Sequence, residues 1–136
     1  MTMTGFPLKI VTLDGLFYDG EAEEVVVRTT SGDMGILARH MNFVAPLGMG
    51  RAAVISEGKC RYAACIGGMV TVVSGEVTLV PTTFEWAESI DAARAEASQE
   101  RAEKILHKKD ASDTEIQLAQ ARLHRALVRT SVASYK

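Results

Sequence analysis

The sequence predicts an α+β fold, in which an N-terminal β-sandwich (a flattened barrel) is followed by a C-terminal antiparallel hairpin of two helices. All eleven glycines and all three prolines lie between Gly5 and Pro81, and none follows. Because both residues interrupt regular structure, the last third favours long helices. Upstream, strand-length runs are separated by turn residues about every 8–12 residues, which is typical of a sandwich. We therefore expect two domains, at residues 1–87 and 88–136.

The first part of the chain alternates strands with turns. A first predicted strand places Leu8 and Ile10 on one face, because side chains alternate along a strand. The Asp-Gly pairs at residues 14–15 and 19–20 are turn signals on either side of a short apolar run. Residues 25–27 are three consecutive valines, which predicts a β-branched strand in the core.

The remaining strands are predicted in the same way. The chain turns at residues 31–33 and enters the apolar run 34–37. Residues 43–47 form a short segment whose proline indicates an edge strand, because proline cannot donate to a neighbouring strand. Two hairpins follow, with turns at Glu-Gly 57–58 and Ser-Gly 74–75.

The period of the sequence changes after residue 87. Ser89 is the predicted N-cap of a first helix, and Asp91 places a negative charge in its first turn. Positive charge at residues 107–109 suits the C-terminal end of that helix. Small and apolar residues recur on one face at Ala95, Ser98, Ala102 and Ile105.

A capping box, in which Ser112 precedes Glu115 by three residues, predicts the start of a second helix. A short connection between two helices makes an antiparallel hairpin. The facing stripe on the second helix is predicted to be Ile116, Ala119, Leu123, either Ala126 or Leu127, and Thr130. A seam rich in alanine and serine buries little apolar area, so we expect a weakly held hairpin that can open.

Composition excludes several classes of function. The net charge is −2 and there is no basic block, so nucleic acid is not an expected partner. The charge divides unevenly: residues 1–87 carry six basic and nine acidic side chains, and residues 88–136 carry nine and eight. No stretch approaches the roughly 18 apolar residues of a membrane span. Cys60 and Cys65 have no nearby partner ligands, which predicts free thiols and no metal site.

Catalytic motifs are also missing. Residues 48–50 form a lone G-x-G without a further glycine or a following helix, and no Walker-type phosphate loop occurs. No serine or cysteine has an evident base. The sequence therefore predicts a protein that is not itself an enzyme, with no catalytic residues and no required cofactor.

Arginines gather where the helical hairpin is expected to close. Antiparallel pairing places Asp91 and Arg94 near Arg125 and Arg129, with Arg101 two turns further along. Several guanidinium groups around one carboxylate suit a polyphosphate, which arginine binds through bidentate, charge-assisted hydrogen bonds. The alternative is that Asp91 pairs with one arginine across the hairpin and the remaining arginines are solvated.

Two polar residues, Asp33 and His40, bracket the apolar run 34–37, which we expect to be a loop. Solvated loop charges are one interpretation of this pattern. The other is an edge at which a partner docks.

The N-terminal half carries two motifs of a known family. Residues 25–27 lead into GDMGILARH at residues 32–40, which resembles the family pattern G-E-[IL]-G-I-x-P-G-H. Residues 67–72, GGMVTV, resemble the pattern G-G-x-[LV]-x-V. The sequence departs from the first pattern at residues 38–39, where Ala-Arg replaces Pro-Gly, so this turn is expected to differ.

Two further motifs lie in the helical half. Residues 90–95, IDAARA, resemble the family pattern [IL]-D-x-x-R-A, and Arg125 and Arg129 match its closing arginine pair. By the order and spacing of all four motifs, most of the chain is similar to the epsilon subunits of bacterial F-type ATP synthases.

The resemblance implies a non-catalytic rotor subunit. It would sit peripherally at the cytoplasmic face of the bacterial cell membrane, where the sandwich contacts the gamma subunit and the c-ring during proton-driven ATP synthesis. The hairpin would fold back or extend toward the alpha and beta subunits, and the extended form would restrain ATP hydrolysis. In several bacteria the folded form binds ATP as a regulatory ligand.

The resemblance also implies positions for these contacts. The c-ring contact would fall on Asp33 and His40. The residues carried over for ATP are Glu85, Ile90, Asp91, Arg94, Ala95, Arg101, Arg125 and Arg129.

Two other functions fit the same residues. A free-standing ATP-sensing adaptor built from a sandwich and a hairpin would bind ATP but purify without gamma. A sandwich adaptor with a purely structural hairpin would bind no nucleotide.

Overall fold

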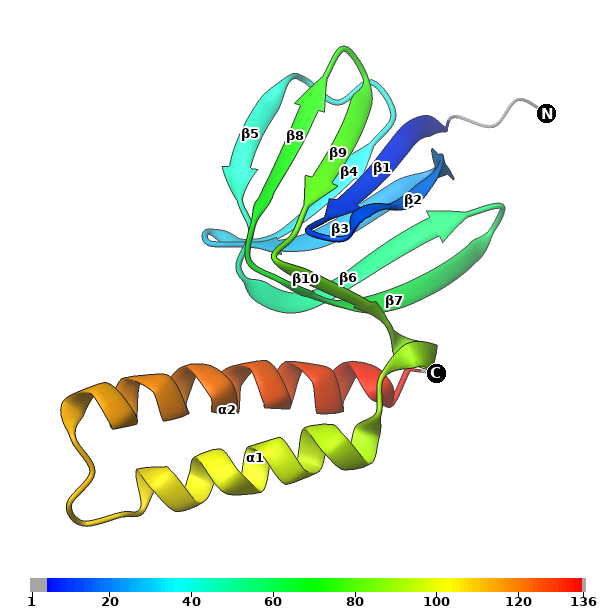
Figure 1. Cartoon of the computed structure of the whole chain (residues 1–136). Coiled ribbons are helices and arrows are strands. Elements are labelled where there is room, and N and C mark those ends of the chain that lie inside the picture. Colours follow the sequence, from blue (N-terminus) through cyan, green and yellow to red (C-terminus); the bar gives the residue numbers. More distant parts are fainter. Residues whose placement is uncertain (1–4, 136) are drawn as a thin grey trace. The chain divides into compact units, whose positions relative to one another are not determined.

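The computed structural model describes residues 5–135 and divides into two compact units, one ending at Trp86 and one beginning at Ala87. The first unit consists of strands and the second of helices (Figure 1). The α+β fold predicted from the sequence is therefore confirmed.

Ten strands form two five-stranded sheets. The first contains, in spatial order, β2 (Gly15–Ala22), β1 (Phe6–Thr12), β9 (Glu76–Val80), β8 (Met69–Val73) and β5 (Phe43–Pro46). The second contains β10 (Thr83–Trp86), β7 (Lys59–Ile66), β6 (Met49–Ser56), β3 (Glu24–Thr29) and β4 (Gly32–Leu37). Neighbouring strands are antiparallel except for β1 and β9, which run parallel.

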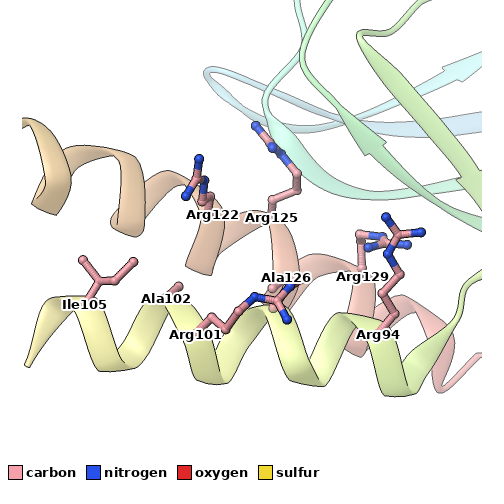
Figure 2. A pocket seen from close by; sticks show the side chains of 9 residues that line it. Arg94, Arg101, Ala102, Ile105, Arg122, Arg125, Ala126 and Arg129 are labelled. Carbon is pink, nitrogen blue, oxygen red and sulfur yellow. Dashed lines mark hydrogen bonds between the residues drawn. The ribbon is translucent and has the colours of Figure 1, made fainter.

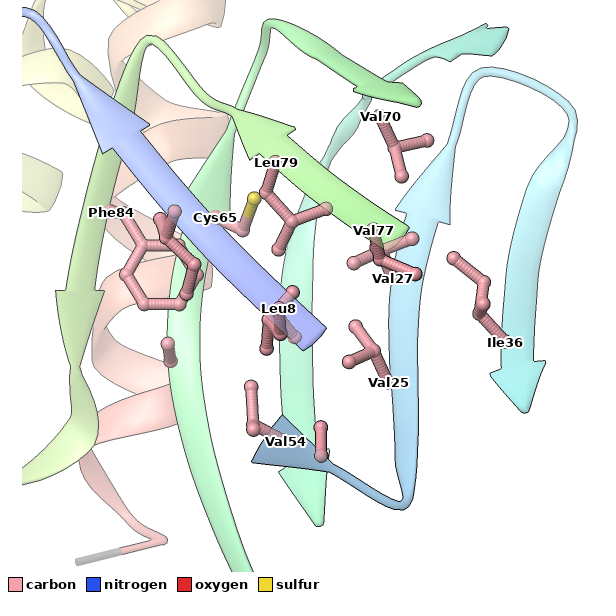
Figure 3. Close-up of a cluster of buried hydrophobic side chains, with 14 of the residues drawn as sticks. Leu8, Val25, Val27, Ile36, Val54, Cys65, Val70, Val77, Leu79 and Phe84 are labelled. Carbon is pink, nitrogen blue, oxygen red and sulfur yellow. The ribbon is translucent and has the colours of Figure 1, made fainter. Parts of the chain in front are cut away.

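The core of the first unit lies between the inner faces of the two sheets (Figure 3). Leu8 and Ile10 of β1 are completely buried, as the alternation in β1 predicts, and Val25 and Val27 of β3 are completely buried as well. The same cluster contains Leu79 of β9. Two sheets thus share one apolar interior, as a sandwich requires.

Backbone geometry confirms the two hairpin turns. At residues 57–58 and 74–75, both central residues have φ between 50° and 80°. Two successive positive φ values define the type I′ turn, whose twist matches that of the flanking strands. The proline-containing strand β5 lies at an edge of its sheet, also as predicted.

Two predictions about the strands were wrong. The Asp-Gly pair at residues 19–20 is not a turn but part of β2, and the Tyr18 ring lies over the space that a side chain at Gly20 would fill. Residues 34–37 are not a loop but belong to the edge strand β4, which pairs with β3. Strand β10, which pairs with β7, was not predicted from the sequence.

The helical unit consists of the short 3-10 helix η1 (Ala87–Ser89), α1 (Ala92–Leu106) and α2 (Asp113–Ala133). The two long helices lie side by side and run in opposite directions (Figure 1). The prediction that Ser89 caps α1 was wrong, because η1 intervenes and Asp91 occupies the N-cap. The predicted capping box of Ser112 and Glu115 is present at α2.

Alanines form the seam between the helices. Ala95 and Ala102 of α1 are buried, as are Ala119 and Ala126 of α2, and each pair is seven residues apart. The sequence left open whether Ala126 or Leu127 faces α1; Ala126 is buried, and Leu127 is 45% exposed. Alanine side chains permit close approach but contribute little apolar burial.

The link between β7 and β8 depends on two glycines. Gly67 and Gly68 have φ values of 66° and 94°, and a Cβ on Gly68 would lie 2.0 Å from the carbonyl oxygen of Val80. Only glycine fits this close backbone approach. Gly58 has a similar φ of 75°, but an added Cβ there meets nothing within 4 Å.

We predict that Gly68→Ala lowers the free energy of unfolding of the sandwich by at least about 3 kcal/mol, because it adds a backbone clash to left-handed strain. Gly58→Ala is the matched control, and it should lose only the strain of about 1–2 kcal/mol. Urea unfolding followed by the emission of Trp86, the single tryptophan, measures both. Equal losses in the two variants would contradict the close-approach argument.

Candidate arginine cleft in the helical hairpin

A cleft of about 380 Å³ opens within the helical unit. Five of its nine lining residues are arginines, which are contributed by both helices (Figure 2). The arginines are Arg94, Arg101, Arg122, Arg125 and Arg129, and the other lining residues are Ser98, Ala102, Ile105 and Ala126. We call this site the arginine cleft.

Helical periodicity places the five arginines around one opening. Arg94 and Arg101 are seven residues apart on α1, which is two turns along one face. Arg122, Arg125 and Arg129 follow one another at spacings of three and four on α2. The alanine seam lets the two helices approach closely, so both sets of guanidinium groups border the same space.

Four of the residues predicted to bind ATP therefore come together, namely Arg94, Arg101, Arg125 and Arg129. Arg122 was not predicted. The spacing of Arg122 could have predicted its place in the cleft. It lies three residues before Arg125 and seven before Arg129, which puts all three on one helix face.

The other predicted residues occupy different positions. The carboxylate of Asp91 accepts a hydrogen bond of 3.1 Å from the backbone N–H of Arg94, so it caps α1. Ile90 is 2% exposed, and Ala95 is completely buried in the helix seam. Glu85 lies on β10 of the sandwich. None of these four residues lines the arginine cleft.

The lining of the cleft presents hydrogen-bond donors almost exclusively. Guanidinium groups only donate, and no lining residue is acidic. The remaining polar side chain is Ser98, whose hydroxyl oxygen accepts a 3.0 Å hydrogen bond from Nη2 of Arg101. This is an environment for an anion with several acceptor oxygens, because planar guanidinium groups match phosphate bidentately.

Of the residues predicted for a c-ring contact, Asp33 lies near the start of β4, and His40 lies three residues beyond its end, in the sandwich unit. The Arg28 guanidinium hydrogen-bonds the Asp33 carboxylate across β3 and β4, and this bond holds the pKa of that carboxyl below its usual range. The Nδ1 of His40 lies 2.9 Å from the carbonyl oxygen of Met41, and its ring centroid is 5.0 Å from that of Phe43.

The turn between Asp33 and His40 carries a backbone strain. Arg39 has φ of 63°, a left-handed conformation, at the position where the resembling motif has glycine. For a residue with a side chain, this left-handed conformation is less stable than a right-handed one by roughly 1–2 kcal/mol. The departure from the motif thus keeps the backbone conformation that glycine would allow and adds a positive charge.

The two cysteines, the possible metal ligands and the hydropathy of the helices were each compared with the predictions. Cys60 is exposed and Cys65 is buried; both are free, and burial raises the pKa of the Cys65 thiol to about 12. Within residues 5–135, no group of three or more histidine, cysteine or acidic side chains is arranged to hold a metal ion. No helix in the described part of the chain is both long and apolar enough to cross a membrane.

Comparisons with known proteins cover both units. Residues 5–87 match the family model of the ATP synthase delta/epsilon chain β-sandwich domain, and residues 88–134 match that of its long α-helix domain. The ATP synthase epsilon chain of Ruminococcus albus is 42% identical over 135 residues, which are 98% of this chain and 100% of that relative.

Two solved structures share the fold. A chain of the Euglena gracilis mitochondrial ATP synthase, solved with OSCP, F1 and the c-ring, has a TM-score of 0.83 and 22% identity over 98% of this chain and 82% of its own. A chain of the Tetrahymena thermophila mitochondrial ATP synthase central stalk and c-ring has a TM-score of 0.60 and 13% identity, over 93% and 95% respectively.

The ion pair of Asp33 and Arg28 predicts a pH dependence. Because the folded-state pKa of Asp33 is lowered, its contribution to stability is present above its unfolded pKa and is lost as the pH falls through the folded pKa. We expect Asp33→Asn to be less stable than the unchanged chain at pH 7, and the difference to shrink on acidification. In an Arg28→Gln background the pH-dependent difference should vanish; its persistence would assign the effect to another group.

Proposed function

Because the chain belongs to the ATP synthase delta/epsilon chain family, we propose that it is the non-catalytic epsilon subunit in the central stalk of a bacterial F-type ATP synthase. The high coverage of the Ruminococcus albus epsilon chain supports this role, since both units of this chain are represented in that relative. The sandwich binds gamma and the c-ring, and the subunit is held peripherally at the cytoplasmic face of the membrane during proton-driven synthesis. Asp33 and His40 contact the c-ring.

The helical hairpin restrains ATP hydrolysis by opening and extending toward the alpha and beta subunits. Two observations support a hairpin that opens. Its seam is made mainly of alanines, whose burial stabilises the closed form weakly. Its two helices also bring five like charges to one cleft, and like charges repel.

The arginine cleft carries the regulatory part of the proposal. Both helices contribute guanidinium groups to it, so a polyphosphate that bridges them binds the closed hairpin better than the open one. A ligand shifts a two-state equilibrium by its differential affinity for the two states. ATP therefore stabilises the closed hairpin and relieves the restraint on hydrolysis. Asp91, Ile90, Ala95 and Glu85 act with the cleft in holding the nucleotide.

A free-standing ATP-sensing adaptor is the second candidate, and the arginine cleft suits it equally. The two candidates differ in their partners. The epsilon subunit copurifies with gamma, alpha and beta, whereas the adaptor purifies alone.

We predict that ATP binds the isolated full chain with a saturable heat in calorimetry and without magnesium, because the arginines supply the counter-charge. Arg94→Ala and Arg129→Ala should each weaken binding by about 1.5–3 kcal/mol, the usual loss for a charged hydrogen bond. Lys104→Ala is the matched control, since it removes a positive charge from α1 outside the cleft. No heat from a folded chain at millimolar ATP would contradict the nucleotide site.

We further predict that deleting residues 88–136 raises ATP hydrolysis by the assembled complex while ATP synthesis continues. The sandwich has its own core and retains the surfaces proposed to bind gamma and the c-ring. Hydrolysis by membranes carrying the full chain or the shortened chain is compared after equal incorporation has been verified with gamma. Unchanged hydrolysis, with and without an energised membrane, would show that the hairpin does not inhibit.

A further inference from the structure

Hydrogen-bond donors dominate the lining of the arginine cleft. Its polar side chains are five guanidinium groups, which only donate, and one hydroxyl, which accepts a hydrogen bond from Arg101. No lining residue is aromatic, acidic or an amide, so the hydroxyl of Ser98 is the one side-chain acceptor in the lining. A cleft with this excess of donors is complementary to a ligand that presents many acceptors.

The guanidinium groups of the cleft are spread along the two helices and are not gathered at a single position; we call this arrangement the strip. Arg94 and Arg101 are seven residues apart on α1, and Arg122 and Arg129 are seven residues apart on α2, so each pair spans about 10 Å along its helix axis. Figure 2 shows the two sets along the facing helices. A single phosphate is too small to contact both ends of such a strip, whereas a chain of linked phosphates follows it.

We propose that the arginine cleft is a binding site for linear inorganic polyphosphate, and that Arg122 is one of its ligand-contacting residues. The inference rests on the proposed function in placing the anion between the same two helices, but it needs no nucleoside. Tripolyphosphate has only phosphate oxygens to offer, and it carries a free terminal oxygen where ATP carries the ribose ester. It therefore meets the cleft with acceptors at both ends.

Arg122 adds a fifth guanidinium group to the four arginines predicted from the sequence. It lies almost one turn before Arg125 on α2 and borders the same cleft as Arg101. Its charge is not offset by any carboxylate among the nine lining residues. Arg122 thus supplies on α2 a guanidinium group at the end of the strip that Arg101 marks on α1. A phosphate chain that spans the strip can contact both helices at this end, which pyrophosphate is too short to do while also contacting the other end.

Calorimetry on the full chain tests the inference with four probes: inorganic tripolyphosphate, pyrophosphate, adenosine and citrate. We expect saturable binding of tripolyphosphate, at least tenfold weaker binding of pyrophosphate and no heat from adenosine. Tripolyphosphate should displace ATP in competition. Citrate controls for general attraction of a multivalent anion, and binding of citrate as tight as that of tripolyphosphate would overturn the assignment to phosphate.

Variants test the position of the site. Arg122→Gln should weaken tripolyphosphate binding at least tenfold, Arg122→Lys should recover part of the loss, and Lys104→Gln should leave binding unchanged. Circular dichroism verifies that each variant keeps its helices. An Arg122→Gln variant that is folded and binds normally would remove Arg122 from the site.

The outcomes separate this inference from the proposed function. Binding of ATP without binding of tripolyphosphate would overturn the inference and leave the nucleotide role intact. Binding of tripolyphosphate without binding of ATP would support the inference and overturn the nucleotide part of the proposed function. Absence of both would overturn both.

Discussion

The close approach of α1 and α2 along a seam of alanines is the constraint on which the helical unit depends. The alanine seam brings α1 and α2 close together, and the same closeness gathers their arginines at one cleft without an acidic lining residue. Alanine burial contributes little apolar area to this contact. In the proposed function, a polyanion that bridges guanidinium groups of both helices adds to the stability of the closed hairpin.

The sandwich follows the opposite principle, because its stability comes from an interior shared by two sheets. Val25 and Val27 of one sheet and Leu8, Ile10 and Leu79 of the other are all completely buried. Truncating any one of these side chains would leave a cavity and destabilise the sandwich. The chain thus joins a unit with a large apolar core to a unit whose two helices meet mainly through alanines.

The sequence predicted the features that depend on local chemistry. Glycine and proline placement separated strands from helices, and the capping box at Ser112 announced α2. Features that depend on tertiary contacts were missed. Ser89 has a good capping side chain, but it belongs to η1, so Asp91 caps α1, which begins at Ala92. Gly20 continues β2 because it pairs with Leu8 of β1. Arg122 lies outside the family motifs, although its spacing from Arg125 and Arg129 places it on the same helix face.

The short connection between the helices has a kinetic consequence. It is held at both ends, by the Nδ1 of His107 2.8 Å from the Glu103 carbonyl oxygen and by the reciprocal bonds of Ser112 and Glu115, with Lys108 beside that carboxylate. Helices that separate while this tether survives stay at high effective concentration, so their reunion is intramolecular. Opening of the kind proposed for the hairpin would therefore be followed by rapid reclosure of the two helices.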